Sequence, residues 1–95
     1  MATAMSGQKT VTAAGTAVAL GAGAVNGPLM VKALLANTNN IYVGNDGANY
    51  VTSANGMQLD AGEVIIFNYV GGLSSIYIDA DTNGEGVSWL MLGAV

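Results

Sequence analysis

Short apolar runs alternate with glycine-containing turns along most of the chain. Turn dipeptides of the Asn-Gly, Asp-Gly and Gly-Gly types stand at 26–27, 46–47, 55–56, 71–72 and 83–84. The runs between them are rich in Val, Ile, Tyr and Leu, which favour β-strands. No window has a convincing amphipathic period of 3.6 residues. The pattern therefore predicts an all-β chain, either a meander or a Greek key.

Eight runs are predicted to be strands. They cover residues 9–13, 16–20, 28–36, 40–44, 55–59, 63–69, 74–80 and 86–92. The last two are expected to form a hairpin across Asn83-Gly84, because this dipeptide favours the positive φ angles of tight hairpin turns. Residues 1–8 lack an apolar pattern and are predicted to be a flexible arm. We therefore expect one domain, residues 9–95, folded as a small β-sandwich or jelly-roll-like barrel of seven to eight short strands.

Two predicted strands are apolar on both faces. In the run 63–69, Val64 and Ile66 alternate with Ile65 and Phe67, and the run 86–92 shows the same double pattern. A sandwich buries only one face of each strand within its own chain. The other face needs a further cover, or it stays exposed as many apolar side chains do in monomers. The expected contacts with another copy or a larger protein are the arm 1–8 and Met30, Leu34, Ile65, Phe67 and Leu90.

The composition supports such a cover. Only 8% of the 95 residues are charged, against about 25% in an ordinary soluble domain, and 52% are hydrophobic. The net charge is -4, and Lys9 and Lys32 are the only basic residues. This balance argues against binding to nucleic acid or to anionic membranes, since both need clustered cations. No signal peptide or transmembrane segment is predicted either.

The stretch DADTNGEG, residues 79–86, raises the question of a cation site. Asp79, Asp81 and Asn83 stand at positions 1, 3 and 5 of a calcium-loop pattern, with Gly84 at position 6. Position 12, which should be a bidentate Glu, is Leu90. Calcium is therefore the one cofactor left open, and the polar tip of a hairpin is the competing interpretation.

Catalytic chemistry has few candidates. The chain has no histidine and no cysteine, so the usual general base and thiolate nucleophile are absent. Most of the six acidic residues fall in predicted turns, where solubility explains them. We therefore expect that the protein is not an enzyme. Sugar binding stays open as an alternative, because Tyr42, Tyr77 and Trp89 could serve as exposed aromatic platforms.

Two stretches carry a resemblance to a known group. Residues IYVG (41–44) and NGMQLDAGE (55–63), together with the closing IYIDA and VSWL, resemble short β-rich virion proteins of tailed bacteriophages. These serve as capsid decoration, cement or head-fibre proteins. The resemblance implies a homotrimer, made in the host cytoplasm, that binds the major capsid protein across subunit joints on the outer surface of the virion. Its alternative is a host-adhesion module of a head fibre or tail.

Overall fold

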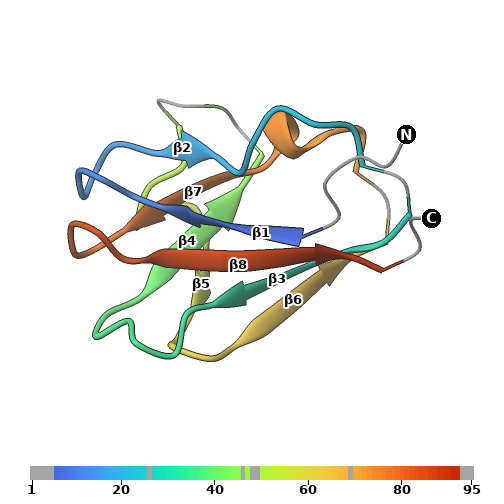
Figure 1. Ribbon diagram of the computed structural model, residues 1–95. Helices are drawn as coiled ribbons and strands as arrows, with labels where there is room; N and C mark the ends of the chain where they lie inside the picture. Colours follow the sequence, from blue (N-terminus) through green and yellow to red (C-terminus); the bar gives the residue numbers. More distant parts are fainter. Residues whose placement is uncertain (1–5, 26, 46, 48–49, 69, 93–95) are drawn as a thin grey trace.

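The computed structural model describes residues 6–25, 27–45, 47, 50–68 and 70–92. Two four-stranded antiparallel sheets pack face to face, so the all-β sandwich prediction is confirmed (Figure 1). The strands are β1 (Ser6–Thr10), β2 (Val18–Ala19), β3 (Leu29–Ala33), β4 (Ile41–Gly44), β5 (Met57–Leu59), β6 (Val64–Phe67), β7 (Tyr77–Ala80) and β8 (Gly86–Met91), with a short 3-10 helix η1 (Leu73–Ser75). Within these ranges no helix has the length and hydropathy needed to span a membrane.

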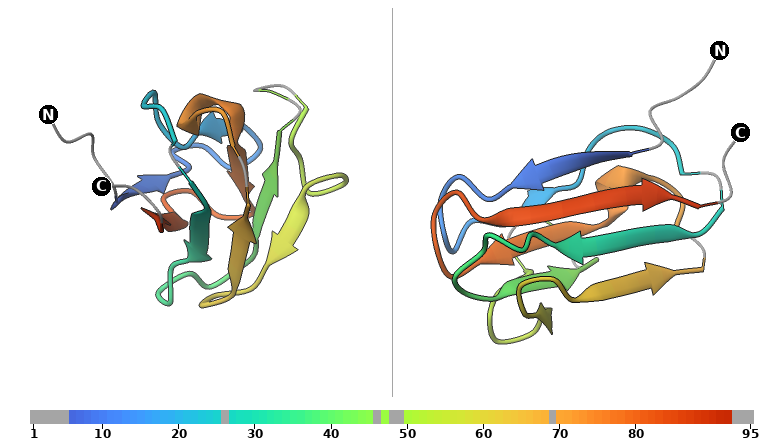
Figure 2. Two further views of the ribbon diagram at one scale, coloured as in Figure 1. Left: turned by 90° about the vertical axis from the view of Figure 1, so that its right-hand side faces the viewer. Right: turned by 60° about the horizontal axis from the view of Figure 1, so that its bottom comes forward.

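The strand order is that of a jelly roll. Sheet A has the order β1-β8-β3-β6, and sheet B has the order β2-β7-β4-β5. The first strand pairs with the eighth, the second with the seventh, the third with the sixth and the fourth with the fifth. The chain is thus a long hairpin that folds over on itself, as in two combined Greek keys (Figure 2).

The core lies between the sheets and takes alternate side chains from every long strand. In β8, Val87, Trp89 and Met91 belong to the core, whereas Leu90 is exposed. In β6, Ile65 and Phe67 pack against the core, whereas Val64 and Ile66 are exposed. The alternation predicted for both strands is therefore confirmed.

The predicted arm is wrong for its last three residues. Ser6, Gly7 and Gln8 belong to β1, where Ser6 pairs with Leu90 and Gly7 pairs with Trp89. Residues 1–5 lie outside the described part of the chain. An edge strand that is polar on its outer face and has glycine on its inner face carries no apolar alternation, so the pattern missed it.

The predicted hairpin across Asn83-Gly84 is also wrong, although the turn exists. Strand β7 lies in sheet B and β8 lies in sheet A, so residues 81–85 cross between the sheets. Gly84 has a φ of 84° in the turn 82–85, which a glycine tolerates without strain. The Gly84 amide donates to the Val11 carbonyl at 2.7 Å, which attaches this turn to the end of β1.

The turn 60–63 determines which residues of β6 form hydrogen bonds with β3. Gly62 has a φ of 84°, and the Glu63 amide donates to the Asp60 carbonyl at 2.9 Å, as in a type II turn. The Gly62 amide donates to the Ala33 carbonyl at 2.9 Å, while the Ala33 amide donates to the Glu63 carbonyl at 2.9 Å. Two residues thus oppose one, which is a glycine bulge at the entrance to β6.

Candidate docking face of sheet A

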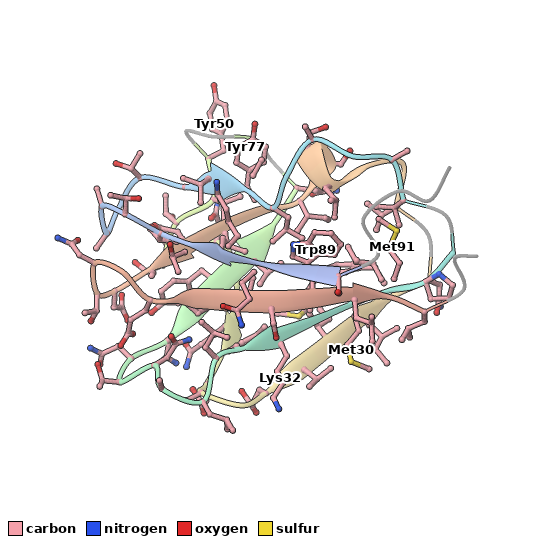
Figure 3. The ribbon with its side chains drawn as sticks, viewed as in Figure 1. Met30, Lys32, Tyr50, Tyr77, Trp89 and Met91 are labelled. Carbon is pink, nitrogen blue, oxygen red and sulfur yellow. The ribbon has the colours of Figure 1, made fainter. Side chains whose placement is uncertain are left out.

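The outer face of sheet A consists of two rows of side chains that cross its four strands. Strand register places Ser6, Leu90, Met30 and Ile66 in one row. The neighbouring row contains Gln8, Ser88, Lys32 and Val64. Met30 and Lys32 project from β3 on this side of the molecule (Figure 3).

Four of the eight positions in these rows form an open apolar patch on β8, β3 and β6, and the other four are polar. The exposed fractions are 43% for Leu90, 50% for Ile66 and 45% for Val64. A shallow hollow of about 400 Å³ crosses β1, β8 and β3, with Met30 and Leu90 among its lining residues. Lys32 is the only charged residue in the two rows. Such a patch suits an apolar protein surface.

The structure divides the predicted contact residues. Met30 and Leu90 lie on the outer face of sheet A, as a docking role requires. Ile65 and Phe67 point to the other side of β6 and are half-buried against the core. Leu34 is half-buried just after β3. A period of two cannot say which half of an all-apolar strand faces inward, so Val64 and Ile66 were missed.

The outer face of sheet B is covered by its own chain. Tyr42 and Asp79 stand opposite each other on neighbouring strands, and only 7% and 3% of their surfaces are exposed. The buried Val51 side chain packs over Gly44, where a Cβ atom would lie 3.0 Å from Val51 Cγ2. At Gly56 a Cβ atom would lie 2.7 Å from Tyr42 Cβ. The segment 50–56 therefore forms a lid over Gly44 and Tyr42 on this face.

The predicted sugar-facing aromatics do not form an exposed platform. Tyr42 points outward from sheet B as its alternation indicates, but the lid buries it. Trp89 is a core residue, and its ring lies against Gly7, where a Cβ atom would be 2.8 Å from Trp89 Cζ2. Tyr77 is half-buried. The expectation of outward exposure is thus wrong for Tyr42 and Trp89.

The candidate cation ligands are held by separate protein donors. Asp79 Oδ1 accepts from the Gly15 amide at 2.9 Å, Asp81 Oδ2 accepts from the Tyr42 hydroxyl at 2.8 Å, and Asn83 Oδ1 accepts from the Ala14 amide at 2.7 Å. Among the described residues no three acidic side chains gather as a metal site would require. The hydrogen bond from Tyr42 to Asp81 raises the pKa of the Tyr42 hydroxyl, since it favours the neutral phenol.

Glu85 ties the connection between the sheets to the turn before β4. Its carboxylate accepts from the Thr38 amide, from Thr38 Oγ1 at 2.8 Å and from the Asn39 amide at 3.1 Å. The bond from the Thr38 amide is the main reason that the pKa of Glu85 lies below its ordinary value. The polar residues of the DADTNGEG stretch therefore form hydrogen bonds that connect it to neighbouring loops and to β4.

Comparison with known proteins adds no relative. No protein-family model matches the chain, and no curated protein or solved structure gives a match.

Proposed function

We propose that this protein is a structural, non-catalytic subunit that docks through the outer face of sheet A onto an apolar surface of a larger protein assembly. The observation that carries the proposal is the row of exposed Leu90 and Ile66 with half-buried Met30 between them, flanked by Val64 and by a single charge at Lys32. The resemblance to decoration and cement proteins of tailed bacteriophages supplies the partner. On this proposal the face binds the major capsid protein on the outside of the shell, across subunit joints.

The energetics favour binding at many equivalent sites. Full burial of one large apolar side chain contributes about 1.5 to 3 kcal/mol. Leu90, Ile66 and Val64 are each about half exposed, so their remaining burial would supply roughly 2 to 4 kcal/mol together. Association itself costs about 4 to 15 kcal/mol. One such face binds weakly, whereas linked copies on a repeating shell gain avidity. A self-associating subunit meets this need.

The test is co-sedimentation of the purified protein with tailed-phage capsids that lack their decoration protein. Wild-type protein should sediment with the shells, and Leu90→Lys should lose binding at least tenfold because it places a charge in the apolar row. Leu35→Lys is the matched control, since Leu35 is 74% exposed but lies outside the two rows. Equal binding by both variants and wild type would contradict docking through this face.

Sugar binding remains a second candidate on one observation. Tyr50 is 65% exposed, and Figure 3 shows Tyr50 and Tyr77 at the same end of the view, above sheet B. Exposed tyrosine rings can stack on sugar faces. Titration with host surface polysaccharide should then show binding that Tyr50→Ala weakens and Leu90→Lys leaves unchanged. Binding that is equal for wild type and Tyr50→Ala would remove this candidate.

A further inference from the structure

The sandwich has four edge strands, and they differ in how well they are protected against pairing with a further strand. Strand β2 has two residues and β5 has three, so both offer little backbone for pairing. Strand β1 carries Lys9 and polar outward residues. Strand β6, Val64–Phe67, has four consecutive apolar residues with no charge and no proline. Natural edge strands are normally blunted by charge, proline or shortness, and β6 has only its modest length.

The backbone of β6 is oriented for pairing. The glycine bulge at 62–63 makes Ala33 and Glu63 a hydrogen-bonded position of the β3–β6 ladder. Hydrogen-bonded and non-bonded positions alternate in antiparallel ladders, so Ile65 and Phe67 direct their amides and carbonyls toward β3. Val64 and Ile66 then direct theirs away from β3, toward the open margin of sheet A that Figure 2 shows beside β6.

A pocket lies beside this edge. It has a volume of about 370 Å³ and opens between β6 of sheet A and strands β4 and β5 of sheet B. Its walls include Ile65 and Phe67, the inward side chains of β6 itself, together with Val43 and Met57. None of its lining residues is charged. A strand added to β6 would place every second side chain in this pocket, which is how sheet edges recognise extended segments.

We propose that the strand added to β6 is the β6 of a second copy of this chain, paired antiparallel about a two-fold axis midway between the two Ile66 residues. A two-fold perpendicular to the sheet keeps inward residues opposite inward residues, so Ile65 would face Phe67 of the second copy across the two pockets. The two Ile66 residues would exchange both backbone hydrogen bonds. The rows Leu90–Met30–Ile66 of the two copies would then join into one apolar surface.

The placement of charge and the largely apolar lining of the pocket both favour a second copy. Asp60 and Glu63 form the acidic turn before β6, and antiparallel pairing places the two turns at opposite ends of the interface. The inward side chains that a second β6 would bring, Ile65 and Phe67, are apolar and suit the uncharged pocket. The pairing stands on the edge geometry and does not depend on docking to a shell.

Light scattering at increasing concentration tests the pairing. The wild-type mass should rise from 9.5 kDa toward twice that value, and Ile66→Pro should stay at 9.5 kDa because it removes the amide that serves the pairing. Leu90→Lys is the matched control, since Leu90 lies in the same row but on the inner strand β8, and it should still form the dimer. Val64→Lys, which places a charge on the edge, is the second variant in case Ile66→Pro does not fold.

The outcomes separate the two proposals. A wild-type protein that stays at 9.5 kDa at millimolar concentration, or that reaches three times this mass as in a trimer, would overturn two-fold pairing. A Val64→Lys variant that folds, by the near-ultraviolet circular dichroism of Trp89, and still dimerises would also overturn it. Failure of shell binding with an intact dimer would instead count against the docking function alone.

Discussion

The outer faces of the two sheets differ in how far the chain itself covers them. On sheet B, Tyr42 and Asp79 point away from the core and are buried. The segment 50–56 covers Tyr42, and the Gly15 amide donates to Asp79. On sheet A, Leu90 and Ile66 also point away from the core, and none of the described chain covers them. The polar face is thus buried by its own chain, while the apolar face is open.

The difference follows from where the long connection lies. The connection from β4 to β5 joins neighbours in sheet B, and its described part, residues 50–56, lies over Tyr42 and Gly44 of that sheet. Other described connections cross between the sheets at the ends of the sandwich. A chain this small has enough residues for one lid, and the uncovered face is the one available to partners.

Removal of Tyr42 should have the largest effect. Tyr42→Ala would leave a cavity under the lid and deprive Asp81 of its hydroxyl donor, and we expect a loss of about 3 kcal/mol in the free energy of unfolding. Tyr50→Ala is the matched control, because Tyr50 is exposed, and should change stability by less than about 0.5 kcal/mol. Urea denaturation measures both, and equal losses would show that the lid does not bury Tyr42 in solution.

A methyl group at position 56 should displace the segment 50–56 from Tyr42. The Cβ atom of Gly56→Ala would lie 2.7 Å from Tyr42 Cβ and 3.1 Å from the Thr52 carbonyl oxygen, so we expect a loss of about 1 to 3 kcal/mol. Gly71→Ala is the control, since nothing lies within 4 Å of its Cβ position. Thermal denaturation compares the two variants. A Gly56→Ala variant as stable as the control would contradict close packing of the lid.

The bond between Tyr42 and Asp81 should appear in an alkaline titration. Because the folded protein raises the pKa of Tyr42 above its ordinary 10.0, the contact stabilises fully below pH 10.0 and is lost as the pH rises toward the raised value. Absorbance at the tyrosinate band should show one tyrosine ionising late, and Asp81→Asn should bring that ionisation to lower pH. An unchanged titration in Asp81→Asn would mean that the carboxylate does not hold the phenol.

A polar substitution on the open face should have the smallest effect on stability. Leu90→Ser should lower the free energy of unfolding by only about 1 kcal/mol, because Leu90 is 43% exposed and outside the core, so only part of its side chain is buried. Urea denaturation at low protein concentration measures the isolated chain. A loss above 2 kcal/mol would show that this face is already buried in the folded state, which would end the contrast between the sheets.

Local patterns predicted much of the fold. Strand positions and turns follow from apolar alternation and Gly-containing dipeptides, and the two-sided alternation of the run 86–92 agrees with the structure. The site was harder to predict. Alternation correctly turned Tyr42 outward, but its burial depends on Val51 and Gly56, which lie in a segment without any periodic pattern. The docking face was found only in part, because Val64 and Ile65 are equally apolar and neighbouring strands decide which one faces in.

The sequence by itself determined an all-β domain with few charges and with more apolar strand faces than its own core can bury. These properties are local or compositional, so they can be read from one residue and its near neighbours. Only the tertiary structure decided that β7 and β8 belong to different sheets, that β6 is an open edge and that the lid lies over sheet B. Each of these depends on pairing between residues far apart in the chain, and a turn residue fixes the direction of the chain without fixing the partner it meets.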